Sequence, residues 1–155
     1  MILVTLGTQI EPFKRLLDYI ENSKLKCKIV VQAGHTKYHS KKMDVFDFIS
    51  YDEMEKLIKE ADLIITHGGT GSIVGALKKG KKIIACARLE KYGEHVDNHQ
   101  QELVEIFKDQ GYILELNEDN NLDDLLLEIK KFVPKEFKSN RSEFIKKLEG
   151  EINNS

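Results

Sequence analysis

The chain has 155 residues, of which 41% are hydrophobic and 32% charged, and its formal net charge is −2. This length suits one domain with one core, and the near-zero charge disfavours a strongly basic nucleic-acid-binding module. No apolar run approaches the ~18 residues of a membrane span, and the chain starts in a strand-like segment without signal-peptide features. We therefore expect one domain over residues 1–155, without a nucleic-acid partner.

Apolar residues follow two periods along the chain, which predict strands and helices in turn. Strand-like runs lie at residues 2–6, 27–32, 45–49, 63–66, 82–87 and 112–116. Helices with one apolar face are expected at residues 13–20, 52–61, 73–79, 98–109 and 122–129, with a last one around 144–148. Asp52 is the expected N-cap of the second helix.

Helices that alternate with almost continuously apolar strands indicate a parallel sheet covered on both faces. We therefore predict an α/β fold, with a doubly wound, Rossmann-like sheet of about six parallel strands. Its core should span about residues 1–132, and residues 133–155 should form a C-terminal helical tail. Cys27 and Cys86 lie in strand-like runs, so both are expected to be reduced core residues of a cytosolic protein.

Right-handed crossovers place the carboxyl ends of all strands at one edge of such a sheet, where ligands bind. Three loops should meet there, at residues 7–9, 67–72 and 88–100.

The middle loop, which reads HGGTGS from His67 to Ser72, is the most informative. Its glycines, Gly68, Gly69 and Gly71, would let the backbone approach a ligand, and the next helix points free N–H groups at the same space. Thr70 and Ser72 add hydroxyl groups, and either could cap the helix. This combination suits a phosphate or pyrophosphate, and His67 could face that anion or bond to the backbone. The alternative is a tight turn whose glycines serve packing alone.

Two other glycine patterns suggest different functions. Gly75 to Lys81 fits the beginning of a P-loop, but Lys82 follows where Ser or Thr is required, and the segment runs from helix into strand. We reject that reading. Gly69, Gly71 and Gly75 resemble a variant dinucleotide fingerprint, and Arg88 could accept a 2′-phosphate, so an NADP-binding oxidoreductase stays open as an alternative.

The third loop concentrates side chains that form several hydrogen bonds. Asp97, Asn98 and Gln100 are suited to hold sugar hydroxyls. His95, Asp97 and His99 could also be metal ligands, but a helix should begin there and separate the two histidines, so we expect no metal site. A solvated loop with a helix cap is the plain alternative.

Several of these segments together resemble a known family. They are the opening ILVTLGT, the stretch ADLIITHGGTGSI from residue 61, GKK at residues 80–82 and DNHQ at residues 97–100. In this order they resemble the glycosyltransferase family 28 C-terminal domain in its stand-alone form. That form is the catalytic subunit of bipartite enzymes, both bacterial ones of exopolysaccharide and capsule synthesis and the eukaryotic dolichol-pyrophosphate GlcNAc transferase.

The resemblance implies the C-terminal half of a GT-B fold. It implies an inverting enzyme that moves a hexose (Gal, Glc or GlcNAc) from a UDP-sugar to a lipid-pyrophosphate-linked sugar in surface polysaccharide synthesis. It also implies no cofactor or metal, and a membrane-anchored, acceptor-binding partner subunit that would hold this cytoplasmic chain at the inner face of the membrane.

The resemblance also suggests roles for individual residues. Residues 68–72, with His67, would cradle the pyrophosphate, and Asp97, Asn98 and Gln100 would face the donor sugar. Ile49 and Tyr51 would lie near the uracil, and Arg88 would also line the donor site. The partner-facing cleft would be lined by Gly7, Thr8 and Gln9.

One departure and one gap remain. Gly75 stands where many members carry a glutamate for the ribose, which leaves a non-catalytic nucleotide-binding subunit as another alternative. The catalytic base is not identified, and its candidates are His67, Glu94 and His95.

Overall fold

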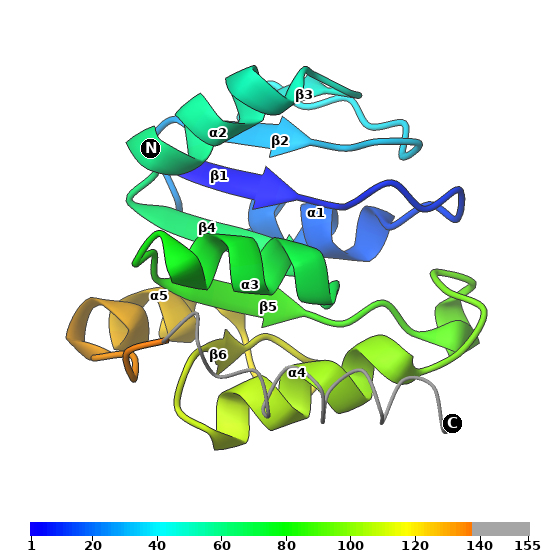
Figure 1. Ribbon diagram of the computed structural model, residues 1–155. Coiled ribbons are helices and arrows are strands. Elements are labelled where there is room, and N and C mark those ends of the chain that lie inside the picture. Colours follow the sequence, from blue (N-terminus) through cyan, green and yellow to red (C-terminus); the bar gives the residue numbers. More distant parts are fainter. Residues whose placement is uncertain (138–155) are drawn as a thin grey trace.

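The computed structural model describes residues 1–137, which form one parallel sheet with helices on both faces (Figure 1). The strand order is β3-β2-β1-β4-β5-β6, and all neighbouring pairs are parallel. The strands are β1 Ile2–Thr5, β2 Ile29–Gln32, β3 Asp44–Phe46, β4 Leu63–His67, β5 Ile83–Cys86 and β6 Leu114–Glu115. The predicted doubly wound, Rossmann-like α/β sheet is confirmed.

Each strand except β2 is followed by a helix before the next strand or the end of the sheet. The helices are α1 Lys14–Glu21, α2 Tyr51–Glu60, α3 Thr70–Lys78, α4 His99–Asp109 and α5 Leu122–Lys131, with a 3-10 turn at Glu90–Tyr92. Residues 133–137, where the helical tail was expected to begin, are not helical, and the helix expected around 144–148 lies outside the described residues. Within residues 1–137, no helix is long and apolar enough to cross a membrane.

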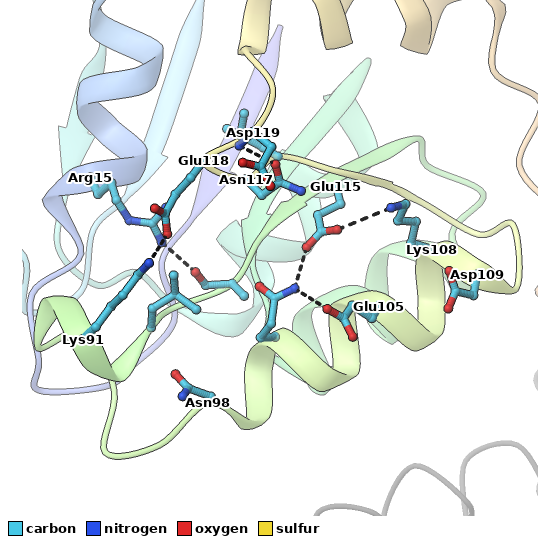
Figure 2. A pocket seen from close by; sticks show the side chains of 14 residues that line it. Arg15, Lys91, Asn98, Glu105, Lys108, Asp109, Glu115, Asn117, Glu118 and Asp119 are labelled. Carbon is cyan, nitrogen blue, oxygen red and sulfur yellow. Dashed lines mark hydrogen bonds and ion pairs between the residues drawn. The ribbon is translucent and has the colours of Figure 1, made fainter.

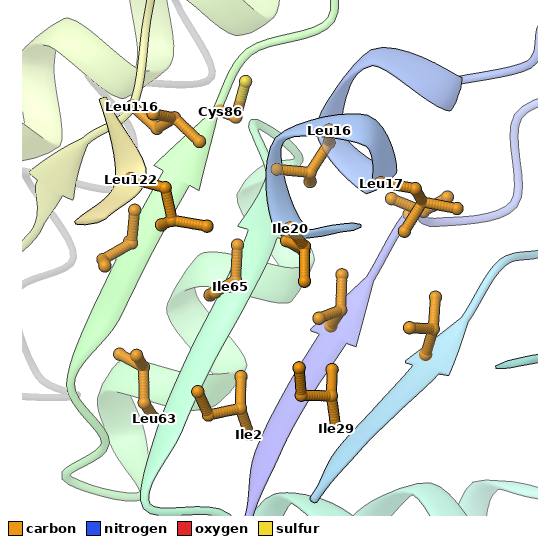
Figure 3. Close-up of a cluster of buried hydrophobic side chains, with 14 of the residues drawn as sticks. Ile2, Leu16, Leu17, Ile20, Ile29, Leu63, Ile65, Cys86, Leu116 and Leu122 are labelled. Carbon is orange, nitrogen blue, oxygen red and sulfur yellow. The ribbon is translucent and has the colours of Figure 1, made fainter. Parts of the chain in front are cut away.

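Successive residues of the central strands point to opposite faces and build two cores. Ile2 and Val4 of β1 face α1 and α5, whose buried side chains close one core (Figure 3). Leu3 of the same strand faces the other core, which α3 and α4 cover. Because β1, β2, β4 and β5 are buried along their whole length, nearly every position in them is apolar.

The start of α2 differs from the prediction. Its N-cap is Ser50, whose hydroxyl accepts a hydrogen bond from Glu53 N at 3.2 Å, whereas Asp52 lies in the first turn. Ser50 has the extended backbone of a cap residue, with φ −64° and ψ 158°. Asp52 instead places a negative charge near the positive end of the helix dipole.

The two cysteines lie in different environments. Cys86 is buried in β5, but Cys27 is exposed, because β2 begins only at Ile29. The expectation of a buried Cys27 is therefore wrong. Burial raises the pKa of the Cys86 thiol to about 12, so almost none of it is thiolate at neutral pH.

We expect a thiol reagent to label Cys27 quickly in the native protein and Cys86 only after unfolding. Mass spectrometry after timed iodoacetamide treatment, with and without denaturant, measures both rates. In Cys27→Ser the fast reaction should disappear, and equal native rates at both thiols would contradict the burial of Cys86.

Candidate functional site

The carboxyl ends of the three central strands bring the predicted loops together. Strand β4 lies between β1 and β5, with Thr5 paired to Thr66 and His67 paired to Cys86. The hydroxyl oxygens of Thr5 and Thr66 lie 2.7 Å apart in a buried hydrogen bond. The loops after β1, β4 and β5 therefore start side by side.

His67, at the end of β4, lies between two glycines. A Cβ at Gly7 would come within 2.6 Å of His67 Nε2, and a Cβ at Gly69 would overlap the same ring at Cε1. Gly7 also has φ +80°, which favours glycine independently. Gly68 has a different neighbour, since its Cβ would meet Gln100 and Val104 of α4. These three glycines make room for protein side chains. This is what the alternative interpretation predicts, in which the loop is a tight turn and its glycines serve packing.

Gly71 and Gly75 are different, because nothing beyond their own stretch of helix lies within 4 Å of a Cβ built at either position. Both line a cavity of about 510 Å³ between α2 and α3 at the carboxyl edge of the sheet. Its walls include Ile49 and Tyr51, and Ser72 in the first turn of α3 also lines it. Six of the predicted donor-binding residues line this cavity: Gly7, Thr8, Ile49, Tyr51, Gly71 and Ser72.

Sequence reasoning missed other residues that line the cavity. They are Thr5, Gln32, Phe48, Ser50, Met54, Glu55, Ile58, Ile64 and Ala76. Phe48 is 48% exposed and Ile58 only partly buried, although both are large and apolar. Met54 and Ile58 lie on the apolar face of the helix predicted at residues 52–61, and this face is the sequence signal that could have found part of the lining.

Helix α3 begins at Thr70, three residues earlier than predicted. Its N-cap is Gly69, without a side-chain cap, and the first intrahelical bond runs from Ile73 N to Gly69 O. The expectation that Thr70 or Ser72 caps the helix is wrong, and the buried Thr70 Oγ1 has no hydrogen-bond partner. The N–H groups of the first turn therefore stay available to an anion beside the cavity.

Gln100, near the start of α4, is 4% exposed and connects all three loops. Its carboxamide oxygen accepts from Gly68 N at 3.0 Å and from Arg88 N at 3.1 Å. Its nitrogen lies 3.1 Å from His67 Nδ1 and 3.4 Å from Gln9 Oε1. The structure thus directs the Gln100 side chain to the protein itself and not to a donor sugar.

The side chains of Arg88 and Glu94 also form their hydrogen bonds with other groups of the protein. The buried Arg88 guanidinium donates to the carbonyl oxygens of Leu6 at 2.6 Å, Glu11 at 2.7 Å and Glu94 at 2.9 Å. The Glu94 carboxylate accepts two bonds from Arg15, both at 3.0 Å. In this structure both side chains are therefore engaged by the protein itself.

The remaining predicted residues bond to one another along the third loop. Asp97 accepts from His99 N at 3.1 Å and pairs with His95 Nδ1 at 3.0 Å. Asn98 accepts from Glu90 N at 3.0 Å, which holds the loop closed. Within the described residues no group of three or more His, Cys, Asp or Glu side chains is arranged to hold a metal ion.

A larger cavity of about 820 Å³, lined by Asn98 among others, lies between α4 and the segment after β6 (Figure 2). Its charged walls pair with one another, as Lys91 does with Glu118 at 2.6 Å and Lys108 with Glu115 at 3.7 Å. We therefore place the candidate site at the smaller apolar cavity, which adjoins the amino terminus of α3.

The parallel sheet and its helices on both faces define a Rossmann-like α/β domain. Solved glycosyltransferase-related structures have the same fold. The NMR solution structure of ALG13 has a TM-score of 0.64 and 20% identity, covering 95% of this chain and 94% of that one. The crystal structure of Acinetobacter baumannii MurG has a TM-score of 0.51 and 17% identity, covering 83% of this chain and 40% of that one.

The family model of the glycosyltransferase family 28 C-terminal domain matches residues 1–152, and the chain belongs to this family. The UDP-N-acetylglucosamine transferase subunit ALG13 of Saccharomyces cerevisiae is 36% identical over 73 residues. That match covers 46% of this chain and 34% of the yeast subunit, so the chain spans about a third of the length of this relative.

The contact between Gly69 and His67 leads to a stability prediction. Gly69→Ala should lower the free energy of unfolding by about 1–3 kcal/mol, because the new methyl group overlaps the imidazole. The loss should shrink in a His67→Ala background, which removes the ring. Gly71→Ala is the matched control and should stabilise the protein by about 0.5–1 kcal/mol, since it lies in α3 beside open space. Urea unfolding measures all four variants, and an equal loss in both backgrounds would contradict the contact.

The buried His67 predicts a pH dependence of stability. Burial, followed by the positive charge of Arg88, lowers the His67 pKa to about 4. Between this value and the ordinary ~6.5 the unfolded chain binds the proton more strongly, so stability should fall as the pH falls through that window. Urea unfolding of the wild type and of His67→Gln across this range should show a flatter dependence in the variant, and identical slopes would contradict a buried, neutral His67.

Proposed function

We propose that this chain is the donor-binding subunit of a glycosyltransferase that uses a UDP-sugar. The observation that carries the proposal is the apolar cavity directly beside the amino terminus of α3. The helix end would bind the pyrophosphate, because its N–H groups and dipole favour negative charge. The cavity, with Ile49 and Tyr51 in its wall, would take the uracil. Membership of the family supports the proposal.

The reaction would break the bond between the sugar and the phosphate, and the bonding electron pair would stay on UDP. The acceptor oxygen would form its bond to the opposite face of the same carbon, which inverts the anomeric centre. The first turn of α3, around Gly71 and Ser72, would stabilise the charge that develops on the leaving phosphate. One such preorganised donor contributes about 2.7–4 kcal/mol to lowering a barrier.

The acceptor hydroxyl must lose its proton to a base. His67 is buried, and Glu94 is bonded to Arg15, so neither candidate base is free to reach an acceptor. His95, the third candidate, pairs with Asp97. Because a carboxylate partner orients a histidine without disabling it as a base, His95 is the remaining candidate in this chain, and a partner subunit is the other source of the base.

Glu55 of α2 is a candidate for the ribose contact that a glutamate at the position of Gly75 makes in many members of the family. Both residues line the apolar cavity, Gly75 from α3 and Glu55 from the facing helix α2. The Glu55 carboxylate forms an ion pair with Lys79, which orients it. We propose that Glu55 accepts hydrogen bonds from the ribose hydroxyls, because the space over Gly75 leaves the sugar room to approach it.

The partner would be a membrane-anchored subunit that binds a lipid-pyrophosphate-linked acceptor. The yeast relative is itself named as a subunit, which supports a divided enzyme. Ile10 and Val96 lie on loops at the ligand edge and are 78% and 74% exposed, as expected of side chains that another subunit covers. Such a partner would hold this chain at the cytoplasmic face of the membrane.

The transferred hexose would be GlcNAc, galactose or glucose, and the name of the yeast relative favours GlcNAc. A role in surface polysaccharide synthesis is supported by the resemblance of the motifs alone. A non-catalytic nucleotide-binding subunit is the second candidate. It is favoured by the bonds from Arg15 to Glu94, which occupy one candidate base.

The proposal predicts that UDP binds to this chain alone and that sugar transfer appears only with a membrane partner. Calorimetric titration tests binding, and product formation from UDP-GlcNAc, UDP-galactose and UDP-glucose in membranes that contain the partner tests transfer. Transfer at the same rate without the partner would contradict the divided enzyme. UDP binding without transfer in any reconstituted mixture would favour the non-catalytic candidate.

Glu55→Ala should weaken UDP binding roughly 10- to 100-fold, the loss expected for a charge-assisted hydrogen-bonded contact of ~1.5–3 kcal/mol. The control is Glu60→Ala, an exposed residue at the end of the same helix that does not line the cavity. Calorimetry with UDP and with deoxy-UDP separates the ribose contact from the rest. If Glu55→Ala weakened both ligands equally, the ribose role would be wrong.

A further inference from the structure

We propose that Gln100 is a positioning residue that keeps His67 in the Nε2–H tautomer and so directs the Ser72 hydroxyl hydrogen toward the ligand cavity. The chain Gln100–His67–Ser72 is called the relay below. The relay is a property of the protein without ligand, whereas its action on a pyrophosphate rests on the proposed function.

The orientation of the Gln100 carboxamide is set by two backbone groups. Gly68 N and Arg88 N both approach the same atom of Gln100, at 3.0 and 3.1 Å. Backbone N–H groups can only donate, so the atom that they share must be the oxygen. The carboxamide nitrogen then faces His67 Nδ1 at 3.1 Å and must donate to it.

This donor determines the protonation of His67. A ring nitrogen that accepts a hydrogen bond carries no proton, so in the neutral imidazole the proton lies on Nε2. The ring has no room to turn over, because Gly7 and Gly69 enclose it at Nε2 and Cε1. Burial and the nearby charge of Arg88 disfavour the imidazolium and keep the ring neutral.

Ser72 is the last member of the relay. Its hydroxyl oxygen lies 3.3 Å from His67 Nε2 and accepts the proton that this nitrogen carries. The hydroxyl hydrogen is then directed away from His67, and Ser72 lines the apolar cavity in the first turn of α3. An anion beside that helix end would therefore meet a preoriented O–H donor in addition to the backbone N–H groups.

The opposite tautomer would reverse the relay. With the proton on Nδ1, Nε2 would be an acceptor, and the Ser72 hydroxyl would donate to it instead of to a ligand. Gln100 therefore acts on the ligand through two other side chains, although its own polar atoms never face the cavity.

Gln100→Glu separates this role from a packing role. The variant keeps the size of the side chain and the oxygen that accepts from Gly68 and Arg88, but it replaces the donor to His67 by an acceptor. In mildly alkaline buffer, where the imidazole is neutral, the proton of His67 should move to Nδ1. Gln110→Glu is the matched control, since Gln110 is an exposed residue at the end of α4.

The first measurement needs no ligand. Nitrogen-15 NMR of the imidazole should show a protonated Nε2 in the wild type and in Gln110→Glu, and a protonated Nδ1 in Gln100→Glu. A wild-type His67 protonated at Nδ1, or a Gln100→Glu variant that keeps its proton on Nε2, would overturn the proposal.

The second measurement follows the relay to the ligand. UDP affinity, measured by calorimetry in the same buffer, should fall about tenfold in both Gln100→Glu and Ser72→Ala, the loss of one hydrogen bond to a charged group. The double variant should lose less affinity than the sum of the two single losses, because both changes remove the same donor and only the added carboxylate charge acts separately. Independent, additive losses would overturn the link to Ser72. The expected tautomers without any UDP binding in the wild type would support the relay and contradict the proposed function instead.

Discussion

The buried guanidinium of Arg88 holds the ligand edge of this domain together. It donates to carbonyl oxygens of Leu6 and Glu11, which lie on the loop after β1, and of Glu94, on the loop after β5. The guanidinium carbon, Cζ, also lies 5.0 Å from the centre of the Phe13 ring. Burial lowers the Arg88 pKa to about 10, so the group stays charged at neutral pH. A buried cation of this kind is tolerated only because several oxygens replace its water.

The other features of the site depend on this connection. Arg88 fixes the loop after β1, and Gly7 in that loop provides one wall around His67. The backbone of Arg88 supplies one of the two N–H groups that orient Gln100. Through Gly7 and Gln100, Arg88 therefore helps to fix the His67 ring at the end of β4, directly before the amino terminus of α3. Pyrophosphate binding, as proposed here, would use a helix end that was positioned before the ligand arrived.

The sequence predicted the sheet well, because a strand buried on both faces, such as Ile29–Gln32, must be apolar almost throughout. It also predicted that the loops after β1, β4 and β5 meet at one edge, since the carboxyl ends of neighbouring parallel strands lie side by side. Whether a polar side chain faces a ligand or the protein could not be predicted. Gln100 and Glu94 have the chemistry of a sugar site, but the loops fold over them, and this depends on contacts between residues far apart in the chain. The cap at Ser50 and the exposed Cys27 were missed because element ends shift by one or two residues.

The open space above Gly75 has a consequence for how such a domain can change over time. Gly75 lies inside α3, where a residue with a side chain forms helix more readily than glycine does. A Cβ there meets nothing beyond its own helix within 4 Å and borders the cavity, so an alanine fits without displacing a neighbour and alters the lining directly. Most binding-site substitutions trade stability for a new preference. At Gly75 the two effects are uncoupled, so one substitution can change the cavity lining without weakening the fold.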